Sequence, residues 1–231
     1  MKLPISNRLL LCASMVKQGA RVADVGTDHG FLPVYLLQNG ICDRVLAADL
    51  REKPLQTAKT NAARFGTAKQ TDFRLSDGLH NIKPDEFDTL VCAGMGGDCI
   101  ALILDAAPWI RDENYTLILQ PQSSGNDLRR YLGEHGYRIE EEHLVQDGRF
   151  LYAAMKARFG GGTPLSVGEQ YASPALLASN DPLLTPYLER IERSLRETVA
   201  GIAKGDTDDD HRKLADYSAA LTEISSFLHR P

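Results

Sequence analysis

The sequence contains little cysteine, and its cysteines are not arranged as a disulfide framework or a metal site would require. They form no Cys-x-x-Cys pair and no cluster with histidine at metal-ligand spacing. The four cysteines are Cys12, Cys42, Cys92 and Cys99. This pattern disfavours both a disulfide scaffold and a zinc site, so we expect no bound metal and a reducing, cytoplasmic location.

The sequence also lacks an apolar run long enough to cross a membrane, so we expect no membrane association. The first residues, MKLPISNRLLLCASMV, combine an early lysine with several leucines, as export signals do. Arg8 interrupts this stretch, and the apolar remainder is at the short end for a signal peptide. We therefore expect an amphipathic first helix.

A net positive charge is missing as well. The formal charge of −5 argues against a protein that binds nucleic acid over its whole surface. The segment 44–74 nevertheless holds seven basic and three acidic residues, which is typical of either a phosphate-facing patch or a solvated helix face. Residues 159–231 hold seven basic and eleven acidic residues, so phosphate attraction cannot be the main means by which they bind RNA.

Glycines and short apolar runs divide the first 120 residues into alternating strand-like and helix-like segments. Strands are expected over 21–26, 44–50, 71–79, 87–97 and 115–122, and helices over 31–40 and 51–66. This alternation predicts an α/β fold with a mostly parallel, doubly wound, Rossmann-like sheet. Residues 137–145 and 150–159 flank an Asp-Gly turn signal and predict an antiparallel hairpin at one edge.

The composition changes at GGGTP, residues 160–164, which is typical of a linker. We therefore expect one domain over 1–159 and a second unit over 160–231. In the second unit, apolar residues recur every three or four positions along 188–202 and 214–228, with Gly205 and an N-capping aspartate between them. This predicts an antiparallel helical hairpin with a coiled-coil-like seam, which would dock RNA by shape or form a weak homo-oligomer contact.

The stretch VADVGTDHGFLP, residues 22–33, predicts a strand, a glycine turn and the start of a helix. In such a turn, backbone N–H groups and the helix dipole face a ligand, and Gly26 and Gly30 let the chain approach it closely. Asp49, which ends the second strand, is suitably placed to bind a ribose diol. Asp77, followed by Gly78, is suitably placed to accept a hydrogen bond from the amine of an adenine.

Asp28 stands where turns of this kind usually carry a third glycine. A carboxylate there would repel the pyrophosphate of a dinucleotide, which makes an oxidoreductase the least favoured interpretation. S-adenosylmethionine carries an ammonium and a sulfonium instead, so Asp28 favours it as the cofactor. The alternative, that Asp28 only caps the following helix, stays open.

These motifs resemble a known family. VADVGTDHGFLP, AADL, SDGL and VCAGMGG, together with ISNRLLLCASMV, LILQPQ and the tail SPALLASNDPLLTPYLERIERSL, are similar to the bacterial tRNA (adenine-22-N1)-methyltransferases of the TrmK type. The resemblance covers nearly the whole chain. It implies a Rossmann-like sheet, a C-terminal helical hairpin, S-adenosylmethionine as cofactor and transfer RNA as substrate and partner.

On this resemblance and the preceding arguments, we expect a set of residues at the carboxyl ends of the strands to bind the cofactor. They are Asp24, Gly26, Asp28, His29, Gly30, Asp49, Leu50, Asp77, Gly78, Gly94, Met95 and Gly96. Asp28 and the backbone at Gly94 would stabilise the cationic methylated base, and Gln120 would contact the adenine edge.

The fourth strand ends in AGMGG and lacks the (Asp/Asn)-Pro-Pro-aromatic motif of enzymes that methylate exocyclic amines. This favours a ring nitrogen such as adenine N1, which the enzyme reaches only after drawing the base out of pairing or stacking. Two alternatives stay open. One is a class I methyltransferase that acts on a small metabolite, and the other is a non-catalytic RNA-binding protein that has kept the fold.

Overall fold

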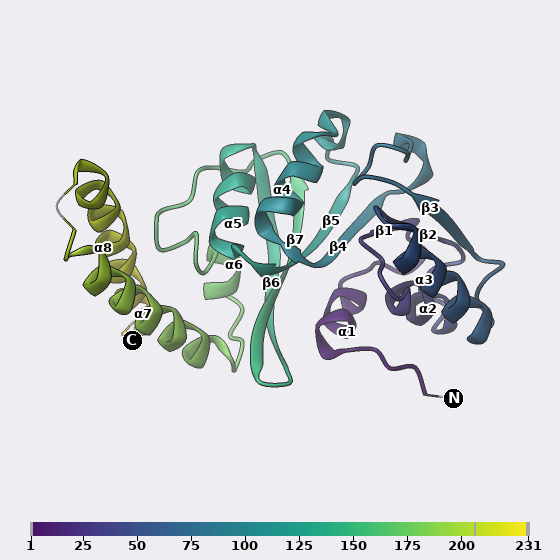
Figure 1. Cartoon of the computed structure of the whole chain (residues 1–231), viewed down its shortest axis with the longest axis horizontal. Coiled ribbons are helices and arrows are strands. Elements are labelled where there is room, and N and C mark those ends of the chain that lie inside the picture. Colours follow the sequence, from purple (N-terminus) through teal and green to yellow (C-terminus); the bar gives the residue numbers. More distant parts are fainter. Residues whose placement is uncertain (1, 206, 230–231) are drawn as a thin grey trace.

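The structure is a computed structural model that describes residues 2–205 and 207–229. Within these residues, seven strands form one sheet in the order β3-β2-β1-β4-β5-β7-β6 (Figure 1). The strands are β1 (Val22–Val25), β2 (Val45–Asp49), β3 (Thr71–Leu75), β4 (Thr89–Gly96), β5 (Thr116–Ser123), β6 (Tyr137–Asp147) and β7 (Phe150–Phe159). Strands β1 to β5 are parallel, whereas β7 is antiparallel to both β5 and β6. The predicted sheet and its edge hairpin are thus confirmed.

Helices cover both faces of the sheet. They are α1 (Asn7–Ser14), α2 (Phe31–Gln38), α3 (Glu52–Arg64), α4 (Gly97–Asp105), α5 (Gly125–Glu134), α6 (Pro174–Leu177), α7 (Leu184–Ile202) and α8 (Asp208–Leu228). Along β5, Leu117 and Leu119 pack in one core with α4 and α5, whereas Ile118 packs in another with α1 and α2. Successive strand residues point to opposite faces, so a strand covered on both sides is apolar at consecutive positions.

The C-terminal helices pack on the β6–β7 hairpin, and α7 and α8 lie side by side as predicted (Figure 1). A third core joins Leu144 and Ala153 of the hairpin to apolar residues of α6, α7 and α8. The expectation of an aspartate N-cap for α8 was wrong. Thr207 is the N-cap, and its hydroxyl accepts from the N–H of Asp210 while the Asp210 carboxylate accepts from the N–H of Thr207. Such a reciprocal pair satisfies two backbone donors that an aspartate cap alone would not.

The segment expected to be a linker is packed against the start of β6. The N–H of Gly160 donates to the carbonyl of Gly136, and a Cβ at Gly162 would lie 2.2 Å from the carbonyl oxygen of Tyr137. Glycine is therefore required at this position by the close approach of two backbones. The division into two domains at this point stays a prediction.

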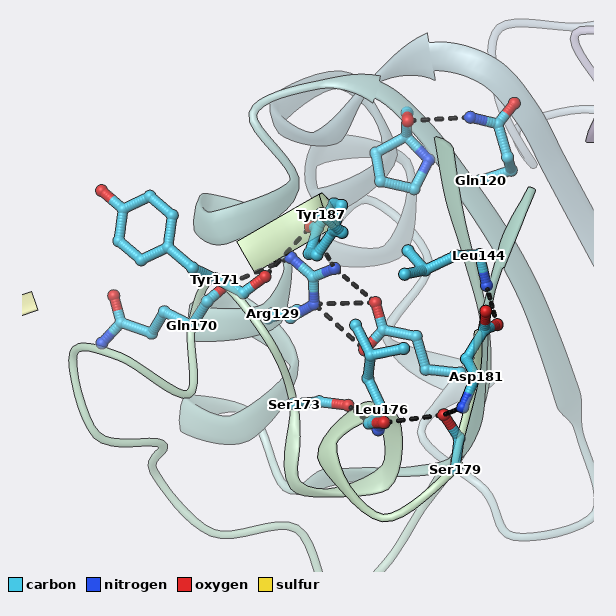
Figure 2. A network of polar contacts seen from close by, with 12 residues as sticks. Gln120, Arg129, Leu144, Gln170, Tyr171, Ser173, Leu176, Ser179, Asp181 and Tyr187 are labelled. Carbon is cyan, nitrogen blue, oxygen red and sulfur yellow. Dashed lines mark hydrogen bonds and ion pairs between the residues drawn. The ribbon is translucent and has the colours of Figure 1, made fainter. Parts of the chain in front are cut away.

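A buried ion pair ties the sheet to the C-terminal helices (Figure 2). Nε of Arg129, on α5, donates to the Glu142 carboxylate on β6 at 3.0 Å, and both side chains are buried. Arg129 also donates to the carbonyl of Gln170 and to the hydroxyl of Tyr187 on α7, and that hydroxyl donates to the carbonyl of Tyr171. These hydrogen bonds link four segments of the chain, namely α5, β6, the loop at 170–171 and α7. They also compensate the cost of burying the charged pair.

Candidate functional site

The predicted cofactor residues meet at the carboxyl edge of the parallel strands. The turn after β1 has left-handed backbone at Gly26 (φ 79°), Asp28 (φ 49°) and Gly30 (φ 69°). A Cβ at Gly26 would lie 2.5 Å from the methyl group of Met95, and one at Gly30 would lie 2.9 Å from the Cβ of Ala58. Both glycines are thus favoured by the left-handed backbone, and at Gly30 the space beside Ala58 excludes a side chain as well.

Asp49 holds this turn in place. Its carboxylate accepts hydrogen bonds from the N–H of Asp28 at 3.2 Å and of Arg51 at 3.0 Å. A carboxylate offers about four acceptor positions, so Asp49 retains capacity for a ligand such as a ribose diol.

The side chain of Asp28 points to solvent and is 66% exposed. Helix α2 has Gly30 as its N-cap, with no side chain capping it, so the interpretation of Asp28 as a helix cap is wrong. Nε2 of His29 lies 3.6 Å from Oδ2 of Asp28, and the His29 ring stacks on Phe31. The structure thus leaves the Asp28 carboxylate accessible to a ligand.

Two further loops complete this part of the edge. Asp77 is exposed, while Gly78 is buried with left-handed backbone, and a Cβ there would lie 3.0 Å from Ile103. Leu50, directly after Asp49, is 62% exposed. Leu50 thus gives the edge an apolar surface beside the polar residues Asp49 and Asp77.

The first helix contributes a residue that the sequence reasoning treated only as a break in an apolar run. Nη1 of Arg8 donates to Oε1 of Gln120 at 3.1 Å. A Cβ at Gly94 would lie 2.5 Å from the same Nη1. Gly94 occupies an irregularity of β4, between the paired residues Ala93 and Met95, and the guanidinium fits against it.

Gln120 is not where the sequence analysis expected it. Its side chain is 0% exposed, and its Nε2 donates to the carbonyl of Pro121 at 2.8 Å (Figure 2). Both ends of the amide are therefore engaged, and the group that Gln120 orients toward the site is Arg8. Direct contact between Gln120 and an adenine edge does not agree with this geometry.

Arg8 lines a cavity of about 140 Å³ together with the turn after β1. Asp24 and Asp28 line the same cavity, so it presents both a cation and carboxylates. Ser6 also lines it, and its buried hydroxyl has no hydrogen-bond partner among the described residues. Leaving such a group unpartnered costs roughly 1–3 kcal/mol. These groups fit a polar, zwitterionic ligand, which describes the amino-acid end of S-adenosylmethionine.

Asp24, the third residue of β1, lines this cavity and is 4% exposed. Burial raises the pKa of its carboxyl to about 7 against the opposing effect of a hydrogen bond from Thr27. The negative charge of Asp49 raises this pKa further, and the positive charge of Arg8 lowers it. The fourth strand closes the site, since Gly96 ends β4 and caps α4. Among the described residues, no group of histidine, cysteine, aspartate or glutamate could hold a metal ion. Nor is any described helix both long and apolar enough to span a membrane.

Comparison with known proteins shows which family carries a site of this kind. A family model described as a methyltransferase domain matches residues 5–155, more than half of the chain. The tRNA (adenine(22)-N(1))-methyltransferase of Bacillus subtilis is 29% identical over 96% of this chain and 98% of its own length. The crystal structure of B. subtilis TrmK covers 98% of this chain and 100% of its own, with a TM-score of 0.87 and 26% identity.

A Streptococcus pneumoniae protein, described as a candidate tRNA (m1A22) methyltransferase, is 30% identical over 97% of this chain and 100% of its own, with a TM-score of 0.84. It has also been crystallised in complex with S-adenosyl-L-methionine. The fold and the glycine turn are those of a class I methyltransferase. The chain belongs to the TrmK family, whose members use S-adenosyl-L-methionine.

Proposed function

We propose that this chain methylates N1 of adenine 22 in transfer RNA, with S-adenosyl-L-methionine as the methyl donor. The observation that carries the proposal is the cavity in which Arg8 lies opposite Asp24 and Asp28, in a chain similar to tRNA methyltransferases along its whole length. When bound, the cofactor supplies a methyl group already activated by a sulfonium. The protein then has to bind the cofactor and the RNA, align the methyl group with adenine N1, and stabilise the positive charge that develops on the base.

Each end of the cofactor has candidate partners. Arg8 would bind the carboxylate of its amino-acid end, and Asp28 would bind the ammonium. The hydroxyl of Ser6, which has no partner among the described residues, would bind a remaining polar atom of this end. Charge-assisted hydrogen bonds of this kind contribute roughly 1.5–3 kcal/mol each.

At the nucleoside end, Asp49 would bind the ribose diol with its unused acceptor positions. Asp77 would accept from the adenine amine, Gly78 would leave room for the ring, and the exposed Leu50 would cover one of its faces. His29 and the backbone of Gly94–Gly96 would complete the wall of the site.

Catalysis needs alignment more than a base, because the lone pair of adenine N1 is free at neutral pH. Alignment alone supplies roughly 7–11 kcal/mol of barrier reduction. The methylated adenine is cationic, so the Asp28 carboxylate and the carbonyl of Gly94 would stabilise the transition state. Gln120 acts through Arg8, as a positioning residue.

The proposal has further parts that await experiment. It places the enzyme in the cytoplasm with tRNA as its partner, in agreement with four cysteines that are all free thiols. A weak homo-oligomer contact through α7 and α8 also stays a prediction.

The decisive experiment is methylation of an unmodified tRNA transcript with labelled cofactor, followed by mapping of the modified nucleotide. We expect one labelled adenosine, at position 22, and no label in a transcript with guanosine there. Free adenosine and adenine serve as small-molecule substrates for comparison. Label in these alone would favour the metabolite enzyme, and absence of both cofactor binding and label would contradict the proposal.

A further inference from the structure

A second groove lies beside the proposed methyl-transfer site. It has a volume of about 330 Å³ and is bounded by the end of β5, the tip of the β6–β7 hairpin and the start of α7. Figure 1 shows the hairpin tip projecting past the sheet next to the first turn of α7. The proposed function assigns this groove no role.

The groove differs in charge from the molecule as a whole. None of the described residues that line it is an aspartate or a glutamate, although the chain carries a net charge of −5. Of its two arginines, Arg129 is neutralised by Glu142, so Arg190 provides the available cation. Arg149 adds a second cation at the hairpin tip. Neither Arg149 nor Arg190 forms an ion pair with a carboxylate in the described part of the chain.

Aromatic rings accompany both cations. The guanidinium of Arg149 lies 4.9 Å from the ring centre of Phe150, and that of Arg190 lies 5.5 Å from the ring centre of Tyr187. Phe150 is 48% exposed, and its ring lies 6.1 Å from that of Tyr152. Tyr187 itself is buried, so Phe150 offers the free ring face. An exposed aromatic ring near unpaired arginines is a combination that binds unpaired nucleotides, by stacking of the base and attraction of the phosphate.

The groove adjoins the proposed methyl-transfer site, since Ser123, which lines the groove, pairs with Gly96 at the end of β4. Gln120, which holds Arg8, is followed directly by Pro121, Gln122 and Ser123, and these three line the groove. The hairpin is also tied to the first helix, since Nδ2 of Asn7 donates to the carbonyl of Gln146 at 2.9 Å. An RNA strand that brings its target adenine to the methyl-transfer site would therefore pass close to this groove.

We propose that the groove binds an unpaired nucleotide next to the target adenine of the RNA substrate. Its base stacks on Phe150, and its phosphate lies near Arg149 and Arg190. The inference rests on the proposed function, because extraction of an adenine for attack at N1 leaves its neighbours unstacked. The groove replaces the lost stacking, and this favours the extruded state of the substrate.

The test compares Phe150→Ala and Arg190→Ala with the parent chain in filter binding of an unmodified tRNA transcript. Each substitution is expected to weaken RNA binding roughly tenfold, whereas Phe150→Trp keeps it. Leu102→Ala and Arg21→Ala are the controls. Leu102 is 70% exposed on α4, and Arg21 precedes β1, at the amino ends of the parallel strands and away from the groove. Both controls should bind like the parent.

The affinity for S-adenosyl-L-methionine, measured by calorimetry, should be unchanged in both groove variants, which separates an effect on RNA from misfolding. A photo-crosslink between 4-thiouridine beside the target adenine and the peptide that contains Phe150 would support the assignment. RNA affinity within about twofold of the parent in both groove variants would overturn it and would favour a protein as the occupant. Because RNA binding is read without turnover, this outcome is distinct from failure of the methylation assay.

Discussion

Arg8 and Gln120 are 112 residues apart in the chain, yet the guanidinium of one donates to the side-chain carbonyl of the other at 3.1 Å. The contact fastens helix α1 to the end of β5, in the centre of the carboxyl edge. It also fixes the position of the cation at the cavity, since Gln120 is fully buried and bonded at both ends. The first helix is therefore part of the site and not only a cover for the sheet.

Replacement of Arg8 by alanine should weaken binding of S-adenosyl-L-methionine by about 10- to 100-fold, because a charge-assisted hydrogen bond is worth roughly 1.5–3 kcal/mol. Calorimetry on the purified variant measures this effect, with Arg64→Ala, an exposed arginine on α3, as the control. Gln120→Leu should produce a smaller loss, because Arg8 remains but is no longer held. An unchanged affinity in Arg8→Ala would remove Arg8 from the cofactor site.

Asp28→Asn should reduce cofactor affinity by about tenfold through loss of the negative charge. Asparagine is the appropriate replacement because it tolerates the left-handed backbone at this position (φ 49°) better than alanine does. The melting temperature should be nearly unchanged, since the side chain is 66% exposed and caps no helix. If the variant keeps full affinity and turnover, the carboxylate has only a local role in the turn.

The stability of the cofactor-free protein should depend on the protonation of Asp24. Its folded pKa of about 7 lies above the ordinary aspartate pKa of 3.8, so the folded chain binds the proton more tightly than the unfolded chain. The stability contributed by this proton is fully present below about pH 4 and is lost as the pH rises through 7. At pH 8, Asp24→Asn should therefore be more stable than the parent, by up to about 4 kcal/mol.

Chemical denaturation of both proteins at pH 5 and pH 8 measures this difference. The advantage of the variant should shrink toward pH 5, where the parent already carries the proton. An equal advantage at both values would mean that Asp24 stays ionised in the folded protein.

The sheet could be predicted from the sequence because its signals are local. Each signal specifies the conformation of residues next to it in the sequence. Examples are the buried strands, the turn glycines Gly26 and Gly30, and the Asp-Gly turn of the hairpin. The same holds for the position of Asp49, since the end of a strand fixes it. Periodicity likewise located the two long C-terminal helices.

The features that the sequence did not reveal depend on contacts between distant segments. Arg8 contacts Gln120 only because α1 folds back over the carboxyl edge, and nothing in the first fourteen residues indicates that edge. The ion pair of Arg129 and Glu142 likewise joins residues that each resemble surface residues in the sequence. At the start of α8, five consecutive residues of N-cap type, 206–210, are candidates to cap the helix, and Thr207 is the one that does so.

Removal of one partner of that ion pair should destabilise the protein strongly. Arg129→Met leaves the Glu142 carboxylate buried without a counter-charge and frees Tyr187 from its donor, at a cost of about 3–5 kcal/mol. The double variant Arg129→Met, Glu142→Leu should regain most of this loss, because no buried charge remains. Urea denaturation of the single and double variants measures both effects. A double variant no more stable than the single one would show that the ion pair itself provides the stability.

The basic segment 44–74 should contribute to RNA binding unequally along its length. Arg74 is already neutralised, since it pairs with Asp72 at 2.8 Å and with Glu86 at 3.0 Å, and its hydrogen bond lowers the pKa of Glu86. Arg64 is exposed and contacts only the ring of Phe65. If the segment faces phosphates, Arg64→Ala should reduce the slope of log affinity against log salt by about 0.7–0.9, and Arg74→Ala should leave it unchanged.

Titration of tRNA binding between 50 and 200 mM salt, a range over which phosphate contacts change affinity by orders of magnitude, gives these slopes directly. Arg74→Ala serves as the matched control, because it removes the same charge from the same segment. If both variants flatten the slope equally, the segment acts through its summed charge and not through individual contacts. A flat slope in the parent would exclude the segment as a phosphate-binding patch, and RNA recognition would then depend on stacking and shape.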